Sequence, residues 1–308
     1  MKKLAFLFPG QGSQEVGMGR GFYDEFELAR NLFLQADRVL GFELSRICFE
    51  GPDEKLKLTQ NTQPALLIVS TIAYSLLSMD PVFAAGHSLG EYSALVAAGA
   101  LTFEDAIVLV HKRGRYMQEA VPVGVGAMAA VLGSDFDSVT NSLAKVRSGV
   151  VEVANWNSKE QIVIAGHAAA VEEALDLIEP PRSVLLPVSA PFHCQLMKGA
   201  EEKLYADLNS VEFRDLAYPI ITNVDAKVIR QGNEARDSLQ RQVTRPVLWY
   251  RSMQLLENEG IDAFVELGAG KVLSRLLKRI AREWSKPPKI LSIHDPDSLA
   301  VARDELSR

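Results

Sequence analysis

The chain is organised around the pentapeptide Gly86-His87-Ser88-Leu89-Gly90, which has the pattern G-x-S-x-G. An apolar run over residues 81–85 precedes it, and a helix-like segment over residues 91–98 follows it. A strand that turns sharply into a helix exposes the central serine, and the glycines permit the bend because they carry no Cβ. The helix N-terminus also directs free backbone N–H groups toward any oxyanion formed there. The pattern predicts a nucleophile elbow at Ser88, although a simple glycine-flanked turn with an exposed serine would match the same five-residue pattern.

The composition is that of a globular protein with a substantial core. The 308 residues are 47% apolar and 23% charged, and the net charge of −6 argues against a nucleic-acid binder. The two cysteines, Cys48 and Cys194, are too few for a disulfide framework or a metal cluster, which favours the reducing cytoplasm. The apolar run Leu4 to Phe8 is too short for a signal peptide. Polar residues interrupt the most apolar span, Ala65 to Met79, so no membrane segment is predicted.

The first third of the chain predicts a strand followed by several helices. The continuous apolar run Leu4 to Phe8 is typical of a parallel strand that is covered on both faces, and a flexible loop with Gln11 follows it. Apolar residues recur at helical spacing from Phe22 to Leu40, and Gly41 is a stop signal. Further helices are predicted over residues 64–78 and from a capping box at Thr102.

The middle of the chain predicts a small inserted unit. Its expected order, β-α-β-β-α-β, is that of a ferredoxin-like fold, with edges at residues 121–124 and at the turn after Ser189. We therefore expect an α/β protein with two subdomains: an α/β-hydrolase-like subdomain with a parallel sheet (residues 1–123 and 191–308) and a ferredoxin-like insertion (residues 124–190). The elements expected in the insertion are strands 127–132, 150–154, 161–165 and 184–188 and helices 135–147 and 168–178.

The last third returns to longer α/β units. The elements expected there are a helix over residues 195–209, a strand over 219–222, a helical stretch around 238–258, a strand over 263–267, and a basic helix that runs to about residue 284.

A serine hydroxyl is a weak nucleophile until a base removes its proton, so the elbow requires a histidine. Of the five histidines, His193 has the most suitable position: it follows the apolar run of residues 184–188 and the turn of residues 189–192, at the carboxyl end of a predicted strand. His294 is the alternative, since it would be the late histidine of the hydrolase order serine, acid, histidine. His87 is expected to support the elbow, and His111 is expected at the surface.

In a Ser-His-acid catalytic triad a carboxylate orients the histidine, and this sequence has no clear candidate for that carboxylate. The candidate carboxylates between Ser88 and His193 lie on predicted helices of the insertion, and their surroundings do not single any of them out. Either His294 is the base, or His193 is oriented by another group such as a backbone carbonyl. These candidate carboxylates are Asp135, Asp137, Glu172 and Asp176.

Four motifs, in the same order and spacing, make this chain similar to the malonyl-CoA:acyl carrier protein transacylase family. The similarity runs from the N-terminus to at least Val272 and includes the insertion. The motifs are Phe8-Pro9-Gly10-Gln11-Gly12-Ser13-Gln14, the elbow continued through Glu91-Tyr92-Ser93-Ala94-Leu95, Lys112-Arg113-Gly114 with Met117-Gln118, and Pro191-Phe192-His193.

The resemblance implies a role for each matching position. Ser88 would carry the malonyl ester and His193 would be the general base, while the backbone N–H groups of Gln11 and Leu89 would form the oxyanion hole. Arg113 would hold the free carboxylate of malonate, because a guanidinium can meet a carboxylate bidentately.

Three further positions complete the site that the resemblance implies. The main-chain carbonyl of Gln242, in Gln242-Val243-Thr244-Arg245-Pro246-Val247, would orient the histidine in place of an acid. His87 would help to shape the site. Phe192 stands where some relatives have serine, and phenylalanine before the histidine resembles malonyl-selective acyltransferases.

The function implied is malonyl transfer from malonyl-CoA to the phosphopantetheine thiol of acyl carrier protein, which supplies extender units for fatty-acid synthesis or, in some relatives, polyketide synthesis. No metal or bound cofactor, no nucleic acid and no membrane is expected, and nothing requires more than a monomer. The alternatives are a serine esterase or thioesterase with water as acceptor, and a non-catalytic module that docks the carrier protein. Because carrier proteins are acidic, a basic helix could contribute to docking, although the simpler explanation of its charges is a solvated face. Its basic residues are Lys271, Arg275, Lys278 and Arg279.

Overall fold

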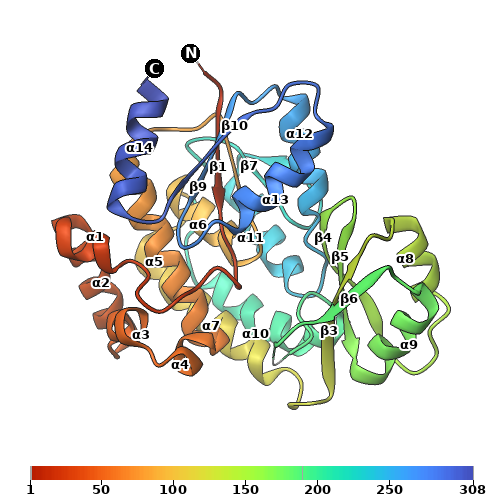
Figure 1. Ribbon diagram of the computed structural model, residues 1–308. Coiled ribbons are helices and arrows are strands. Elements are labelled where there is room, and N and C mark those ends of the chain that lie inside the picture. Colours follow the sequence, from red (N-terminus) through yellow and green to blue (C-terminus); the bar gives the residue numbers. More distant parts are fainter. Residues whose placement is uncertain (1, 189, 308) are drawn as a thin grey trace.

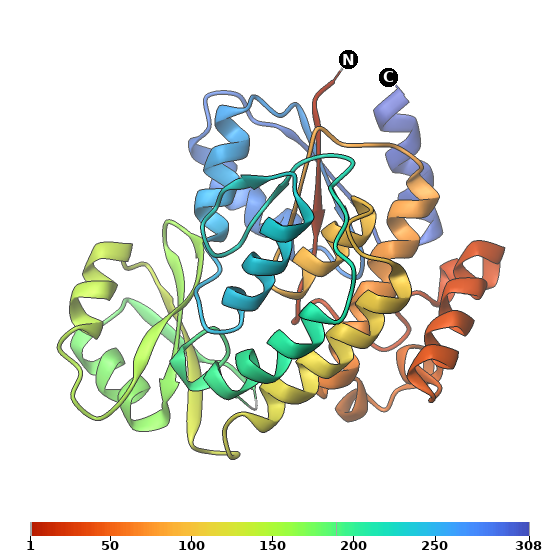
Figure 2. The same ribbon diagram turned by 180° about the vertical axis from the view of Figure 1, so that it is seen from behind.

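Two β-sheets and the helices around them make up the computed structural model, which describes residues 2–188 and 190–307 (Figure 1). The larger sheet has six strands and the smaller has four. The smaller sheet and two helices project as a lobe, drawn in green in Figure 1 and seen from behind in Figure 2. Ser189, at a predicted edge of this lobe, lies outside the described residues. Within the described ranges, no helix has the length and apolar character needed to cross a membrane.

The larger sheet has the strand order β10-β9-β1-β2-β7-β8. Its first five strands are parallel, and β8 pairs with β7 in the antiparallel sense, so the sheet is mixed. The predicted strands 4–8 and 263–267 are confirmed at these bounds. The strands are β1 (Leu4–Phe8), β2 (Phe83–Gly86), β7 (Ile220–Ile221), β8 (Val228–Ile229), β9 (Ala263–Leu267) and β10 (Lys289–Ile293).

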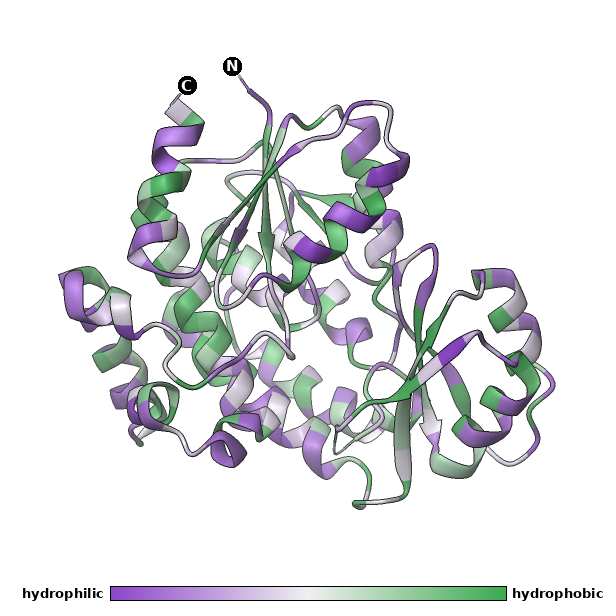
Figure 3. Cartoon of the chain, in the orientation of Figure 1, coloured by the Kyte–Doolittle hydropathy of each residue, from purple (hydrophilic) through white to green (hydrophobic). Residues whose placement is uncertain are grey.

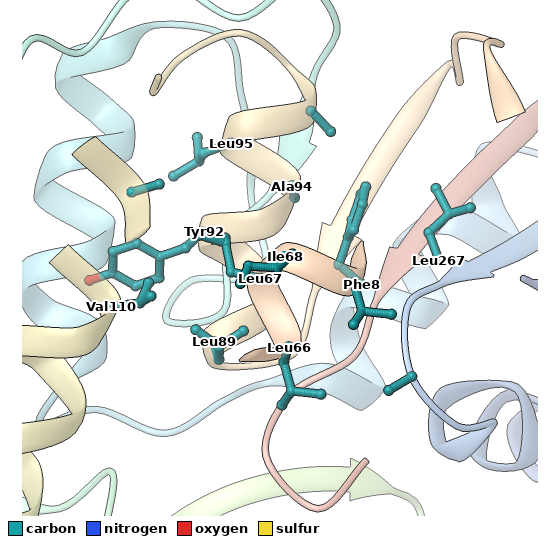
Figure 4. Close-up of a cluster of buried hydrophobic side chains, with 14 of the residues drawn as sticks. Phe8, Leu66, Leu67, Ile68, Leu89, Tyr92, Ala94, Leu95, Val110 and Leu267 are labelled. Carbon is teal, nitrogen blue, oxygen red and sulfur yellow. The ribbon is translucent and has the colours of Figure 1, made fainter. Parts of the chain in front are cut away.

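Helices cover both faces of this sheet, which explains the uninterrupted apolar run of β1. Phe6 and Phe8 point into a core shared with α5 (Thr59–Leu77) and α6 (Leu89–Ala97). The alternate residue Leu7 belongs to a second core with α12 (Trp249–Asn258) and α13 (Val272–Ile280). In Figure 3 the central strands and α5 are mostly hydrophobic, and Figure 4 shows Phe8 and side chains of α5 and α6 within the first core.

The smaller sheet is antiparallel throughout, with the order β4-β5-β3-β6. One face of this sheet, which carries Val131 and Ile162, packs on α8 (Phe136–Leu143) and α9 (Ala168–Ile178). On the other face, Met128 joins the core of the larger sheet. The predicted element order β-α-β-β-α-β is confirmed. The strands are β3 (Gly126–Leu132), β4 (Val151–Ser158), β5 (Gln161–His167) and β6 (Arg182–Leu185).

Backbone hydrogen bonds join β4 of the smaller sheet to the segment between α11 (Gly232–Gln242) and α12. The N–H of Trp156 in β4 donates to the carbonyl of Val247 (2.9 Å), and the N–H of Val247 donates to the carbonyl of Ala154 (2.9 Å). Val247 directly precedes the segment that leads into α12. The edge of the small sheet is therefore attached to the chain between α11 and α12.

Several predicted helices differ from those observed. The stripe from Phe22 to Leu40 is divided between α1 (Arg20–Glu25) and α2 (Glu27–Leu40), because Phe26 is extended (φ −115°, ψ 126°) and ends the first helix. The stretch around residues 238–258 is also two helices, α11 (Gly232–Gln242) and α12. Pro246 lies between them; it lacks an N–H and disfavours helical backbone at the residue before it.

Other boundaries also shift. The helix predicted over residues 64–78 begins earlier, at Thr59, and the helix predicted over 135–147 ends at Leu143. The predicted cap at Thr102 is confirmed, since its side chain accepts a hydrogen bond from the N–H of Asp105. The remaining helices are α3 (Leu44–Glu50), α4 (Asp53–Lys57), α7 (Phe103–Glu119), α10 (Lys198–Asn209), α14 (Pro296–Ser307) and the 3₁₀ helices η1 (Gln195–Met197) and η2 (Ala281–Glu283).

Candidate active site

Ser88 lies at the turn between β2 and α6, where a strand, a sharp turn and a helix follow one another as predicted. Its backbone is left-handed (φ 52°, ψ −107°), a conformation that costs free energy for a residue with a Cβ. The flanking glycines are required by packing: a Cβ on Gly90 would lie 2.0 Å from the carbonyl oxygen of Phe8, and one on Gly86 would lie 1.9 Å from the backbone of Gly90. Close backbone packing thus holds the strained serine at the carboxyl end of the sheet.

His193 is the histidine that the fold brings to Ser88. The Ser88 Oγ lies 2.8 Å from His193 Nε2, and His193 Nδ1 lies 2.8 Å from the main-chain carbonyl of Gln242. A carbonyl only accepts, so Nδ1 must carry the proton, and Nε2 has a free lone pair that faces the serine hydroxyl. The arrangement can therefore remove a proton from Ser88 without a carboxylate behind the histidine.

Burial keeps this imidazole neutral. His193 is 4% exposed. Burial, and next the positive charge of Arg113, lower the pKa of His193 to about 3, while the hydrogen bond to Gln242 opposes the shift. The neutral form, which is the base, consequently prevails at physiological pH.

Arg113 is buried at the nucleophile, not solvated as an isolated arginine on a helix would be. It lies on α7 and is 1% exposed. Its Nη2 donates to Ser88 Oγ (3.1 Å) and to the Gln242 side-chain oxygen (2.8 Å), and its Nη1 donates to Gln63 Oε1 (2.7 Å). These three partners are uncharged, and Nε has no partner among the described residues. A buried cation with neutral partners can pair with an incoming carboxylate.

A pocket opens over Ser88. Gln11, Leu89 and Phe192 line it together with Gln63 and Met117. The loop after β1 lies against the elbow, since a Cβ on its Gly10 would lie 2.3 Å from the carbonyl oxygen of the residue that precedes Ser88. Gln11 and Leu89 therefore lie next to the serine, and their role as an oxyanion hole stays a prediction. Within residues 2–188 and 190–307, no three His, Cys, Asp or Glu side chains are grouped as a metal ion requires.

His87 faces the small sheet. Its Nε2 lies 2.8 Å from Asn157 Oδ1 on β4, and its ring centroid lies 5.4 Å from that of Trp249. Through these contacts His87 connects the elbow to β4 and to α12. A supporting role of His87 in the site stays a prediction.

The other candidates lie elsewhere. His294 follows β10, where its Nε2 is 3.4 Å from the carboxylate of Asp295, and it lines a different hollow from Ser88. His111 is half-buried, so it is only partly at the surface, and its Nδ1 lies 2.9 Å from the carbonyl of Gln60. The four carboxylates considered for a triad are exposed on the far lobe: Asp135, Asp137, Glu172 and Asp176.

A second hollow adjoins the first and shares Gln11 and His87 with it. Arg275 and Arg279 of α13 line this hollow, and both are exposed. Part of the basic helix thus lies beside the approach to Ser88. Lys271, by contrast, lines the hollow near β10 and α14.

Three site residues were missed at the level of sequence. Gln63 on α5 is a partner of Arg113. Asn223, just after β7, accepts a hydrogen bond from the N–H of Ser88 (2.7 Å). Glu91 on α6 is fully buried and accepts from three donors. A carboxylate in the otherwise apolar first turns of α6 is a signal that could have found Glu91, because charges are rarely fully buried without a reason.

A serine at a strand-to-helix turn with a neutral histidine at its hydroxyl defines a class of enzymes that work through acyl-serine esters. Within that class, the chain belongs to the acyl transferase domain family, whose pattern matches residues 5–301.

Known relatives agree over nearly the whole length. The chain is 45% identical to the malonyl CoA-acyl carrier protein transacylase of Bacillus subtilis, over 98% of this chain and 96% of that protein. The solved structure of the malonyl CoA-acyl carrier protein transacylase from Coxiella burnetii has a TM-score of 0.95 at 38% identity, with 100% and 98% of the two chains covered. A malonyl-transacylase solved in complex with its type II PKS acyl-carrier protein has a TM-score of 0.94 at 39% identity, with 98% and 99% covered.

Proposed function

We propose that this protein is a malonyl-CoA:acyl carrier protein transacylase, which moves the malonyl group to the phosphopantetheine thiol of the carrier through an ester on Ser88. The observation that carries this proposal is the contact of Arg113 with Ser88 Oγ (3.1 Å). It places a buried cation within reach of the free carboxylate of an acyl group on that oxygen. An acetyl group would leave the guanidinium without a charged partner, which favours malonyl as the substrate.

The first half-reaction forms the ester. Ser88 Oγ attacks the thioester carbonyl carbon while its proton passes to His193 Nε2, and the backbone N–H groups of Gln11 and Leu89 stabilise the tetrahedral oxyanion. The C–S bond then breaks, and the leaving CoA thiolate takes the proton from His193. Phe192 and His87 shape the site around these groups.

The second half-reaction reverses the roles. His193 removes the proton from the phosphopantetheine thiol, the thiolate attacks the malonyl ester, and Ser88 leaves with the proton returned by His193. The main-chain carbonyl of Gln242 orients His193 throughout. Arg275 and Arg279 beside the site suit the approach of an acidic carrier protein.

We also propose that the molecule has two subdomains. The sheet order β4-β5-β3-β6, antiparallel throughout, supports a ferredoxin-like insertion over residues 124–190. The parallel strands and the elbow support an α/β-hydrolase-like subdomain over residues 1–123 and 191–308. The two free cysteines are both buried, which is compatible with the cytoplasmic location expected from the sequence.

The proposed function is tested by trapping the intermediate. The protein is incubated with radiolabelled malonyl-CoA, freed of excess substrate, and chased with holo-acyl carrier protein or with buffer alone. Label should move to the carrier and stay on the enzyme in buffer. A serine esterase or thioesterase would release label to water in both chases, and a docking module would take up none.

The rate of ester formation should depend little on acidification. For a free imidazole of ordinary pKa, the fraction in the basic form would fall about tenfold by about pH 5.5. Because the pKa of His193 is lowered to about 3, the base form persists well below neutrality. We expect the single-turnover rate to change less than about twofold between about pH 7.5 and about pH 5.5. Rapid-quench labelling measures this rate, with circular dichroism at each pH as the control for folding. An acid limb near the ordinary histidine pKa would contradict the prediction.

A further inference from the structure

Glu91 is the one carboxylate of the elbow helix that the proposed mechanism leaves without a task. It lies in the first turn of α6 and its side chain is fully buried. Its Oε1 accepts from Ser238 Oγ (2.8 Å), and its Oε2 accepts from the N–H of Asn223 (3.0 Å) and from Gln242 Nε2 (2.8 Å). One side chain thus joins the elbow helix to the loop after β7 and to the end of α11.

The contact with Gln242 has a consequence for the amide group. A carboxylate oxygen only accepts, so the NH₂ end of the Gln242 side chain must face Glu91. The same NH₂ end donates to the carbonyl of Ser88 (3.1 Å). The oxygen end is then left to face Arg113, where it accepts from Nη2 (2.8 Å).

The contact with Asn223 acts on the elbow itself. The Asn223 side chain accepts from the N–H of Ser88 (2.7 Å) and donates to the carbonyl of Gly86 (2.6 Å). Glu91 therefore also fixes the backbone of the residue that holds the strained turn at Ser88.

We infer that Glu91 is a positioning residue for acyl selectivity: as a hydrogen-bond acceptor it fixes the side-chain amide of Gln242, and this amide in turn holds Arg113 at the nucleophile. The inference rests on the proposed function, because Arg113 selects malonyl only if malonyl is the substrate. Glu91 touches neither Ser88 Oγ nor His193. Its loss should therefore affect malonyl transfer, which depends on Arg113, more than acetyl transfer, which does not.

Three substitutions of Glu91 distinguish the effect of its hydrogen-bond acceptor from the effects of its charge and of its side-chain volume. Glu91→Met keeps the volume but removes the acceptor, and Glu91→Asp withdraws it by one methylene group. Glu91→Gln keeps an oxygen for Asn223 and Gln242, while its NH₂ can donate to Ser238. The measured quantity is the ratio of kcat/KM for malonyl-CoA to that for acetyl-CoA. We expect the ratio to fall about fivefold or more in Glu91→Met, as the loss of an acceptor for buried hydrogen-bond donors implies, and to fall in Glu91→Asp, but to stay near the parent value in Glu91→Gln.

The matched control is Glu266→Met. Glu266 is another buried carboxylate, on β9, and it accepts from the N–H groups of Leu273 and Ser274 at the start of α13. Its replacement should lower thermal stability and leave the ratio unchanged, which separates a positioning role from a general loss of packing.

The outcomes are distinct. The inference is overturned if folded Glu91→Met keeps the malonyl-to-acetyl ratio of the parent enzyme. It is also overturned if this ratio falls in Glu91→Gln or in Glu266→Met as much as it does in Glu91→Met. If Glu91→Met does not fold, Glu91→Asp decides, and a parent ratio there overturns it. A parent enzyme that transfers no malonyl at all contradicts the proposed function instead.

Discussion

A Ser88→Ala variant is expected to retain no radiolabel after incubation with malonyl-CoA and denaturation. Ser88 Oγ is the atom that His193 Nε2 faces at 2.8 Å, and alanine removes it without adding bulk at the strained turn. Loss of the nucleophile in serine enzymes lowers turnover by about 10⁴-fold or more, and we expect a fall of that order in malonyl transfer to the carrier.

The control for this variant is Ser93→Ala. Ser93 lies on the same helix, and its buried hydroxyl has no hydrogen-bond partner within the described ranges. This variant should take up label as the parent does. Retained label on Ser88→Ala would show that another residue forms the ester, and peptide mapping of that label would identify it.

An Arg113→Ala variant is expected to lose malonyl transfer selectively. The guanidinium is 1% exposed, so a malonyl carboxylate in the pocket would be left buried and unpaired without it. Removal of one partner of a buried charge pair costs about 2–5 kcal/mol, which predicts a fall of about 30-fold to about 5,000-fold in kcat/KM for malonyl-CoA. The value for acetyl-CoA should change much less, because acetyl has no charge to pair. Steady-state kinetics with both thioesters measure the two effects.

Two further variants sharpen this prediction. Arg113→Lys keeps the charge but not the planar fork that binds Gln63 and Gln242 together, so it should recover only part of the malonyl activity. Arg115→Ala, on the exposed side of the same helix, should leave selectivity unchanged. An Arg113→Ala enzyme with the parent preference for malonyl would exclude the carboxylate clamp.

Much of the fold is readable from local patterns. The run Leu4 to Phe8 predicts a strand covered on both faces, and alternate residues of β1 indeed enter two different cores. Glycines and the Thr102 cap mark several element ends correctly. Local patterns fail where a break depends on one residue's backbone, as at Phe26, or where Pro246 interrupts a helical composition.

Some features of the candidate site can also be predicted from the sequence, whereas others depend on the tertiary structure. The elbow follows from sequence order, because its strand, turn and helix are consecutive. The contact of His193 with Ser88 does not follow from it: the strand before His193, β6, belongs to the antiparallel smaller sheet, so the rule that parallel strands bring their carboxyl ends to one edge does not apply to it. Arg113 was singled out only by resemblance, since nothing in its own helix distinguishes it from a surface arginine. Gln63 and Asn223 could not be predicted from local sequence, because their partners are 50 and 135 residues away.

The sequence by itself determined that a serine lies at a strand-to-helix turn, that a histidine follows a later strand, and that a small β-α-β-β-α-β unit lies between them. These features are local, since they depend on backbone conformation and the periodicity of side chains. Only the tertiary structure decided that a carbonyl faces the histidine, that Arg113 is buried against Ser88, and that Glu91 joins the elbow to Gln242. Those contacts connect α6, α7 and α11, and hydrogen bonds between distant segments exist only once the helices have packed.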